Sequence, residues 1–215
     1  VDVWRGVIEA VNSNAKEVDG QKLYPHMHGD EGWYDFTPHP FSRGAEEVYY
    51  WSMDPADRQR LEGHGWVDFL AGENPEYPLA ALQRDLDRLR QKAAAPRNDT
   101  TTPDTRLSDD MNPINPAVTE TLTQLMLGGL PTGRTGFPLH CRLRYFDPER
   151  RRSGLPEGVA ALVDSMSADE VGVQLVNIDP LRARSVQIQG GAYGEHHLQQ
   201  VQVGDQIAEL DNRAF

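Results

Sequence analysis

The chain has 215 residues, of which 38% are apolar and 25% charged, and its formal net charge is −12. This composition excludes a disordered chain, and the surplus of acidic residues argues against a broad phosphate-binding surface, so we expect no nucleic-acid partner. No apolar run approaches the roughly 20 residues that span a bilayer, so we expect no membrane insertion. We expect a soluble protein that is periplasmic or secreted rather than cytoplasmic.

Helical periodicity dominates the first part of the chain. The clearest helix is predicted over 77–95, with Pro96 ending it. Its apolar residues follow one face at spacings of three and four: Leu79, Leu82, Leu86 and Leu89. Further helices are predicted at 3–11, 43–53, 55–61, 64–72 and 116–127.

Two of these helices have recognisable starts. Asp54 precedes Pro55, and Asn115 precedes Pro116, which is the pattern of an N-cap followed by a proline in the first turn. Gly128 should stop the last helix. Between the first two helices, residues 19–42 are rich in Gly, Pro, His and aromatic residues, so we expect a long ordered loop.

After residue 130 the apolar period changes to two. Strands are predicted at 139–146, 171–175, 186–188 and 198–203, with a short helix at 156–165. Short strands at this spacing predict an antiparallel β-sandwich. Cys141, the single cysteine, lies in the first strand, where we expect a buried thiol rather than a nucleophile.

The densest cluster of chemically reactive side chains lies in and just after the predicted loop. It consists of His26, His28, Asp30, Glu31, Trp33, Tyr34, Asp35, His39, Arg43, Glu46 and Glu47. A Gly- and Pro-rich loop on a rigid scaffold is a common setting for functional residues. We therefore expect any site of this chain to lie here.

The first interpretation of the cluster is acid–base work on a glycoside, which needs two carboxyl groups on either side of one bond. The candidate catalytic residues are Asp30, Glu31, Asp35 and Glu46. The candidate substrate-binding residues are His26, His28, Trp33, Tyr34 and Arg43. The two aromatic rings would form a sugar platform, and Arg43 would bind a charged group.

Two other interpretations stay open. His26 and His28, two residues apart, can bind one divalent metal if the segment is extended. The run His-Met-His-Gly-Asp-Glu resembles the His-x-His-x-Asp-His signature of metallo-β-lactamase-fold hydrolases, with Glu31 in place of the last histidine, and also the first half of a cupin motif. Alternatively, the histidines and acids only hydrogen-bond the loop to itself.

Helices with aromatic and acidic loops, followed by the Val/Ile-rich stretch 171–191, resemble the (α/α)-toroid carbohydrate-active enzymes that carry a C-terminal β-sandwich. The resemblance implies a ring of helical hairpins around a cleft and a catalytic carboxylate in that cleft. It implies an α+β fold with a partial toroid-like helical region at 1–130 and an antiparallel β-sandwich-like region at 131–215. We expect the sheet to be incomplete at the C-terminus.

The leading functional hypothesis is part of a glycoside hydrolase or polysaccharide lyase that binds a carbohydrate. The alternatives are a non-catalytic binding or assembly subunit of a larger complex, and a metal-dependent or cupin-like enzyme using His26 and His28. No cofactor is expected, apart from a divalent metal in the last case. The partner would be the remainder of the protein's own chain or another subunit. An enzyme should show paired carboxyls facing a cleft, and an assembly module a large exposed apolar face.

Overall fold

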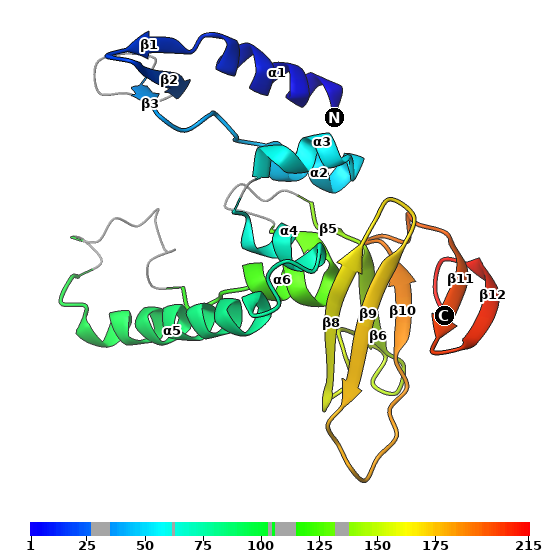
Figure 1. Cartoon of the computed structure of the whole chain (residues 1–215). Helices are drawn as coiled ribbons and strands as arrows, with labels where there is room; N and C mark the ends of the chain where they lie inside the picture. Colours follow the sequence, from blue (N-terminus) through cyan, green and yellow to red (C-terminus); the bar gives the residue numbers. More distant parts are fainter. Residues whose placement is uncertain (27–34, 62, 103–104, 106–114, 132–137) are drawn as a thin grey trace. The chain divides into compact units, whose positions relative to one another are not determined.

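The computed structural model describes the chain in several stretches, with a mixture of helices and antiparallel strands (Figure 1). The described residues are 1–26, 35–61, 63–102, 105, 115–131 and 138–215. The structure is 33% helical and 30% strand, which confirms the α+β class. Among the helices of these residues, none is both long enough and apolar enough to span a membrane.

The residues group by their contacts into two compact units. The first comprises Val1–Val67 and Ser167–Asp169, and the second Asp68–Met166 and Glu170–Phe215. The short helix α4 (Gly65–Leu70) carries the chain from one to the other.

Three helical segments and a small sheet build the first unit. The helices are α1 (Asp2–Ser13), α2 (Ala45–Ser52) and α3 (Pro55–Arg58), which runs into the 3-10 helix η1 (Gln59–Leu61). The Asp54 carboxylate accepts a hydrogen bond from the backbone N–H of Ala56 at 2.9 Å, so the predicted cap before Pro55 is confirmed. The buried core residues of this unit are Ile8, Phe41, Ala45, Val48, Tyr50, Leu61, Trp66 and Val67.

The segment predicted as a long loop contains strands, so that prediction is wrong in its described part. Strand β2 (Gln21–His26) lies between β1 (Lys16–Val18) and β3 (Asp35–Thr37), antiparallel to both. Pro25 is tolerated in this central strand because β1 pairs only as far as Leu23, so the missing N–H of Pro25 faces no β1 residue. Residues 27–34 lie outside the described part.

The second unit contains two helices that contact each other through the Tyr77–Gln124 hydrogen bond and the Arg88–Glu120 ion pair. They are α5 (Tyr77–Asn98) and α6 (Glu120–Leu127). Helix α5 continues two residues past Pro96, so the predicted stop at this proline is wrong; only the last turn has to accommodate the missing N–H. Helix α6 starts later than predicted and ends, as predicted, at Gly128, whose φ of 57° is left-handed.

The strands of the second unit form several small antiparallel sheets. They are β4 (Gly129–Leu130), β5 (His140–Cys141), β6 (Leu143–Asp147), β7 (Arg152–Ser153), β8 (Val159–Met166), β9 (Val171–Asn177), β10 (Gln187–Gly190), β11 (Leu198–Val203) and β12 (Gln206–Asn212). Strand β6 is central in the order β10-β6-β7, and β8 and β9 form a long hairpin. Their shared core contains Leu143, Tyr145, Val163 and Ile188.

Two sequence predictions fail in this unit. The helix predicted at 156–165 is strand β8, because pairing with β9, in which Val163 faces Val173, satisfies its backbone and buries its valines. The described strands lie in separate sheets of two or three strands, and the described helices do not form a ring of hairpins. The described residues therefore form neither the sandwich nor the partial toroid that the resemblance implied.

The end of the chain returns to the main sheet. Phe215 and Ile188 exchange backbone hydrogen bonds at 2.9 and 2.8 Å, and the N–H of Gly190 donates to the carbonyl of Arg213. These bonds add the last residues to the free edge of β10. The hairpin β11–β12 precedes this edge segment, and Val203 and Ile207 on it are exposed.

Candidate functional site

The structure describes four of the predicted site residues: His26, Asp35, Arg43 and Glu46. The others lie outside the described residues: His28, Asp30, Glu31, Trp33 and Tyr34. The roles assigned to this second group, including the metal pair that needs His28, therefore stay predictions.

The β2–β3 pairing brings two of the described candidates together. His26 and Asp35 are direct cross-strand partners. The Nε2 atom of His26 lies 3.1 Å from the carbonyl oxygen of His39, and its ring packs edge-on against Phe41 with 6.0 Å between centroids. Because a carbonyl only accepts, Nε2 carries the proton and donates, which leaves only Nδ1 for a metal.

The two described carboxylate candidates make separate contacts. Asp35 is exposed, and its Oδ1 accepts the backbone N–H of Phe36 at 2.9 Å. Glu46 lies in the first turn of α2, with its Oε2 atom 3.3 Å from Nε2 of His64. Neither contact joins Asp35 to Glu46 as an acid–base pair, and Arg43 is exposed in the turn before α2.

Within the stretches of chain that the structure describes, no group of three or more His, Cys, Asp or Glu side chains is arranged to hold a metal ion. This finding does not include His28, the second predicted ligand.

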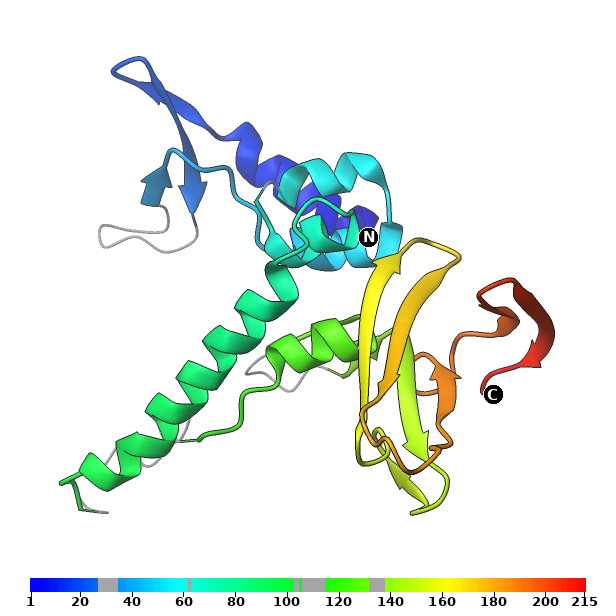
Figure 2. The same ribbon diagram turned by 60° about the horizontal axis from the view of Figure 1, so that its bottom comes forward.

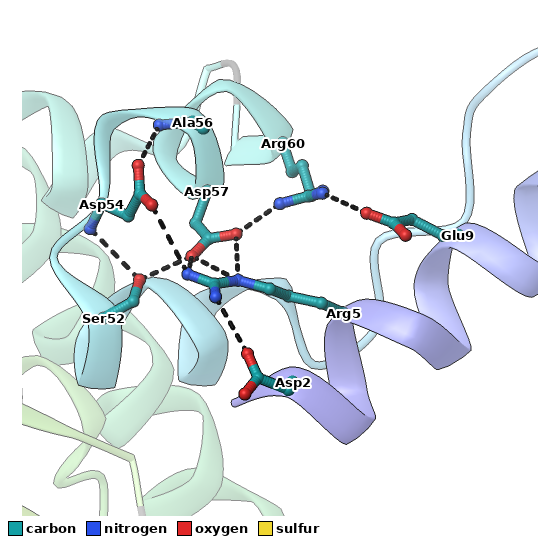
Figure 3. Close-up of polar contacts among 8 residues, drawn as sticks. All are labelled: Asp2, Arg5, Glu9, Ser52, Asp54, Ala56, Asp57 and Arg60. Atoms are coloured by element: carbon teal, nitrogen blue, oxygen red, sulfur yellow. Dashed lines mark hydrogen bonds and ion pairs between the residues drawn. The ribbon is translucent and has the colours of Figure 1, made fainter.

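A polar cluster in the first unit, which the sequence pattern does not reveal, is centred on Asp57 (Figure 3). Arg5 of α1 donates from Nε to both carboxylate oxygens of Asp57 at 3.0 Å, and Arg60 of η1 donates from Nη1 to Oδ1. The Ser52 hydroxyl donates to Oδ2 at 2.6 Å. The Asp57 side chain is only 2% exposed, so these donors replace nearly all of its water.

Further acids complete the cluster around the two arginines. Arg5 also pairs with Asp2 at 3.1 Å and with Asp54 at 3.6 Å, and Arg60 pairs with Glu9 at 3.0 Å. The hydrogen bonds from Arg5 lower the pKa of Asp57, against the opposing effect of its burial. The same bonds raise the pKa of the Arg5 guanidinium. Asp57 is thus ionised at neutral pH and joins α1 to α3, which indicates a structural role rather than acid–base catalysis.

The prediction for Cys141 is confirmed. The residue is 1% exposed, and burial raises the pKa of its thiol to about 12. A nearby turn is held by Glu195, whose carboxylate accepts the backbone N–H groups of Ala192 at 3.1 Å and Tyr193 at 2.7 Å. These bonds lower the pKa of Glu195 against its desolvation. Because burial raises its pKa to about 12, the Cys141 thiol is protonated at neutral pH and is a poor nucleophile.

Helix α5 carries the feature that stands out as an interaction surface. One side of it is fixed to its own unit: Ala81 is buried, the Tyr77 hydroxyl donates to Gln124 of α6 at 3.1 Å, and Arg88 pairs with Glu120 at 3.6 Å. The adjacent, exposed surface of α5 carries four leucines. We call this surface the leucine face and define it as Leu79, Leu82, Leu86 and Leu89. These four side chains are 58%, 43%, 46% and 41% exposed.

The leucine face is a continuous apolar stripe rather than a set of isolated exposed residues. Its members follow each other at spacings of three, four and three residues, which places them in one row along the helix. Single exposed leucines are ordinary, whereas a contiguous apolar patch marks an interaction site. The periodicity was visible in the sequence, but the structure adds that these four side chains are exposed in the part of the chain that it describes.

Part of the chain is similar to a known family. Residues 62–123 match the model of a family described as a domain of unknown function (DUF8034). The matched stretch contains α4, the whole of α5 and the start of α6. No curated protein and no solved structure matches the chain. The comparisons therefore place the leucine face inside a segment that is similar to this family, and assign no activity.

Proposed function

We propose that this chain is a non-catalytic assembly module that docks a partner helix on the leucine face of α5. The observation that carries the proposal is the exposure of all four leucines, 41–58%, on a helix whose other side is packed against α6. An amphipathic helix is stable in water when its apolar stripe is buried against another element. Here the buried side is narrow, and the wider apolar stripe has no element over it in the described chain.

The remaining exposed area is large enough to matter energetically. Complete burial of a leucine contributes about 1.5–3 kcal/mol, and about half of each side chain is still exposed, so each can contribute about 1 kcal/mol on docking. Four leucines then provide about 4 kcal/mol before the cost of association. This supports a real but moderate affinity, to which flanking charged residues would add specificity.

The geometry of the stripe favours a helix as the bound element. Spacings of three and four residues are those of the a and d positions of a heptad, which accept side chains from a facing helix. Helix α5 has 22 residues and is therefore about 33 Å long, so the four leucines offer a straight seam over roughly half of its length.

The carbohydrate-active enzyme predicted from the sequence has less support from the described contacts. Glu46 contacts His64, Asp35 caps its own hairpin strand, and the Asp57 carboxylate is saturated by arginines. For Asp57, the hydrogen bonds from Arg5 lower the pKa, which is the opposite of what a general acid needs at neutral pH. The assembly function accounts for an observed surface, so we give it precedence.

Protection of the leucine face in the native setting tests the proposal. We would introduce Leu86→Cys into the protein as it occurs in its source, with Gln91→Cys, an exposed position on another side of α5, as the matched control. Cys141 stays silent because its thiol is buried and protonated. We expect a maleimide to label Leu86→Cys at least about tenfold more slowly in a native extract than in the dilute purified chain, and Gln91→Cys equally in both. Equal labelling of Leu86→Cys in both settings would refute the proposed function.

A further inference from the structure

We infer that the helix docked on the leucine face is α5 of a second copy of this chain, in a parallel, in-register pair. The inference rests on the proposed function, because it names the partner of the same surface. The charged residues that flank the leucines favour this partner and this orientation.

The leucine spacing fixes the positions of these charges. With Leu79 and Leu86 at a, and Leu82 and Leu89 at d, Asp85 occupies a g position and Arg90 an e position. In a parallel pair, a residue at g faces the e residue five positions further along the other helix. Asp85 of each copy therefore meets Arg90 of the other, and the two-fold symmetry makes this ion pair twice, once on each side of the seam.

Both groups are available for this contact. Asp85 is half-buried, and its Oδ2 atom has no hydrogen-bond partner in the part of the chain that the structure describes. Arg90 pairs with Asp87 of its own helix at 3.2 Å, but both side chains are 67% exposed, so that pair is weak and easily exchanged. A guanidinium arriving from a second copy would bring a positive charge beside the Asp85 carboxylate, whose Oδ2 atom is covered by its own chain without a hydrogen bond.

The antiparallel arrangement of the same four leucine layers is less favourable. In that arrangement g positions face g positions, so Asp85 approaches Asp85 of the other copy in the middle of the seam, where like charges repel. Its attractive contact, Arg90 with Glu76, falls before the first leucine. The repulsive contact of the parallel pair, Lys92 with Arg97, falls beyond the last leucine and past Pro96. Within the seam, only the parallel order pairs opposite charges.

In both views of the second unit, the C-terminal half of α5, which begins near Leu89, extends away from α6 and from the strands (Figure 1, Figure 2). The seam is nevertheless short: Ala93 continues it at an a position, and Pro96 ends it at the next d position. A contact of about two heptads lies at the small end of specific interfaces, so we expect the isolated chain to associate in the micromolar to millimolar range, and the further contacts of the native assembly to strengthen the pair.

Self-association and directed cross-linking test the inference. By sedimentation equilibrium, the purified chain should be a monomer at about 1 µM and a dimer at about 1 mM. Asp85→Arg and Arg90→Asp should each weaken dimerisation at least about tenfold, and the double variant should restore it, because it re-forms the pair with reversed signs. Such rescue would not follow from a merely structural role of either residue. Under mild oxidation, Leu86→Cys alone should form a disulfide-linked dimer, because a positions face each other in a parallel pair.

The contradicting outcomes are distinct from those of the proposed function. A chain that stays monomeric at about 1 mM overturns the second copy as partner. A cross-link that needs Leu82→Cys together with Leu86→Cys, and does not form with Leu86→Cys alone, overturns the parallel order. In either case, protection of Leu86→Cys in the native extract would still uphold docking of another helix, whereas loss of that protection refutes docking itself.

Discussion

Removing the charge of Asp57 should destabilise the first unit selectively. In Asp57→Asn the side chain keeps its size, but two guanidinium groups, from Arg5 and Arg60, lose their shared carboxylate. Removing one member of a buried ion pair costs about 3–5 kcal/mol. Both arginines retain other acids and are 29% and 28% exposed, so we expect the lower end, about 3 kcal/mol.

The tryptophans make this measurement specific. Trp4, Trp33, Trp51 and Trp66 are the four tryptophans of the chain, and all lie within the first 67 residues. Urea unfolding followed by tryptophan fluorescence therefore reports the unfolding of the first unit. The matched control is Glu9→Gln, which changes an exposed partner of Arg60. Its free energy of unfolding should stay within about 0.5 kcal/mol of wild type.

The acid dependence gives a second readout of the same group. The pKa of Asp57 is lower in the folded chain than in the unfolded one, where it is about 3.9. Its contribution is therefore complete above pH 4 to 5 and is lost as pH falls through the lower folded value. Wild type should lose stability in this window, and Asp57→Asn should show a shallower loss. A loss below about 1 kcal/mol at pH 7 with an unchanged acid profile would refute the reasoning.

Three further predictions concern the second unit. Leu82→Lys combined with Leu86→Lys should lower the free energy of unfolding by only about 1 kcal/mol per site, because both side chains are already half exposed. Far-UV circular dichroism during urea unfolding measures this change. A collapse of the fold would contradict the exposure of the leucine face. Gly128→Ala should lower the free energy of unfolding by about 1–3 kcal/mol, since the φ of Gly128 is 57° and the new Cβ would lie 3.2 Å from Cγ1 of Val163. An unchanged thermal melting temperature would contradict this and show that the end of α6 relaxes freely. Cys141 should react with a thiol reagent at pH 8 only after unfolding in urea, because burial raises its pKa to about 12; rapid labelling of the native chain would disprove its burial.

Elements with short-range determinants were predictable from the sequence. The Asp54–Pro55 start of α3 and the Gly128 stop of α6 depend on residues within one turn, and both are confirmed. The strand β6 was evident from alternation, with Leu143 and Tyr145 buried as its period of two requires. In each case the local pattern and the tertiary environment agree.

Elements that depend on distant partners were not predictable. Residues 156–165 have the Ala- and Leu-containing composition of a helix, but pairing with β9 decides their structure. The β2–β3 hairpin is hidden in a Gly- and Pro-rich segment for the same reason. The Asp57 cluster joins residues 52 positions apart, and no spacing rule links Arg5 to Asp57 before the chain is folded.

For the candidate site, the sequence showed a pattern but not its setting. Leucines at spacings of three and four look the same whether the stripe packs into a core or faces solvent. The exposed fractions decide between the two, and for Leu79, at 58%, they indicate an uncovered surface. The acidic and histidine-rich segment holds many reactive groups and was therefore the predicted site. In its described part, His26 contacts the carbonyl of His39, and Asp35 accepts the backbone N–H of Phe36.

The assembly function requires that the leucine face of α5 is covered when the protein is in its native surroundings. Comparing the maleimide reactivity of Leu86→Cys and Gln91→Cys in a native extract decides this in one measurement. We predict slow modification at position 86 and fast modification at position 91. Equal, fast modification at both positions would show a face that binds nothing, and would contradict the assembly function.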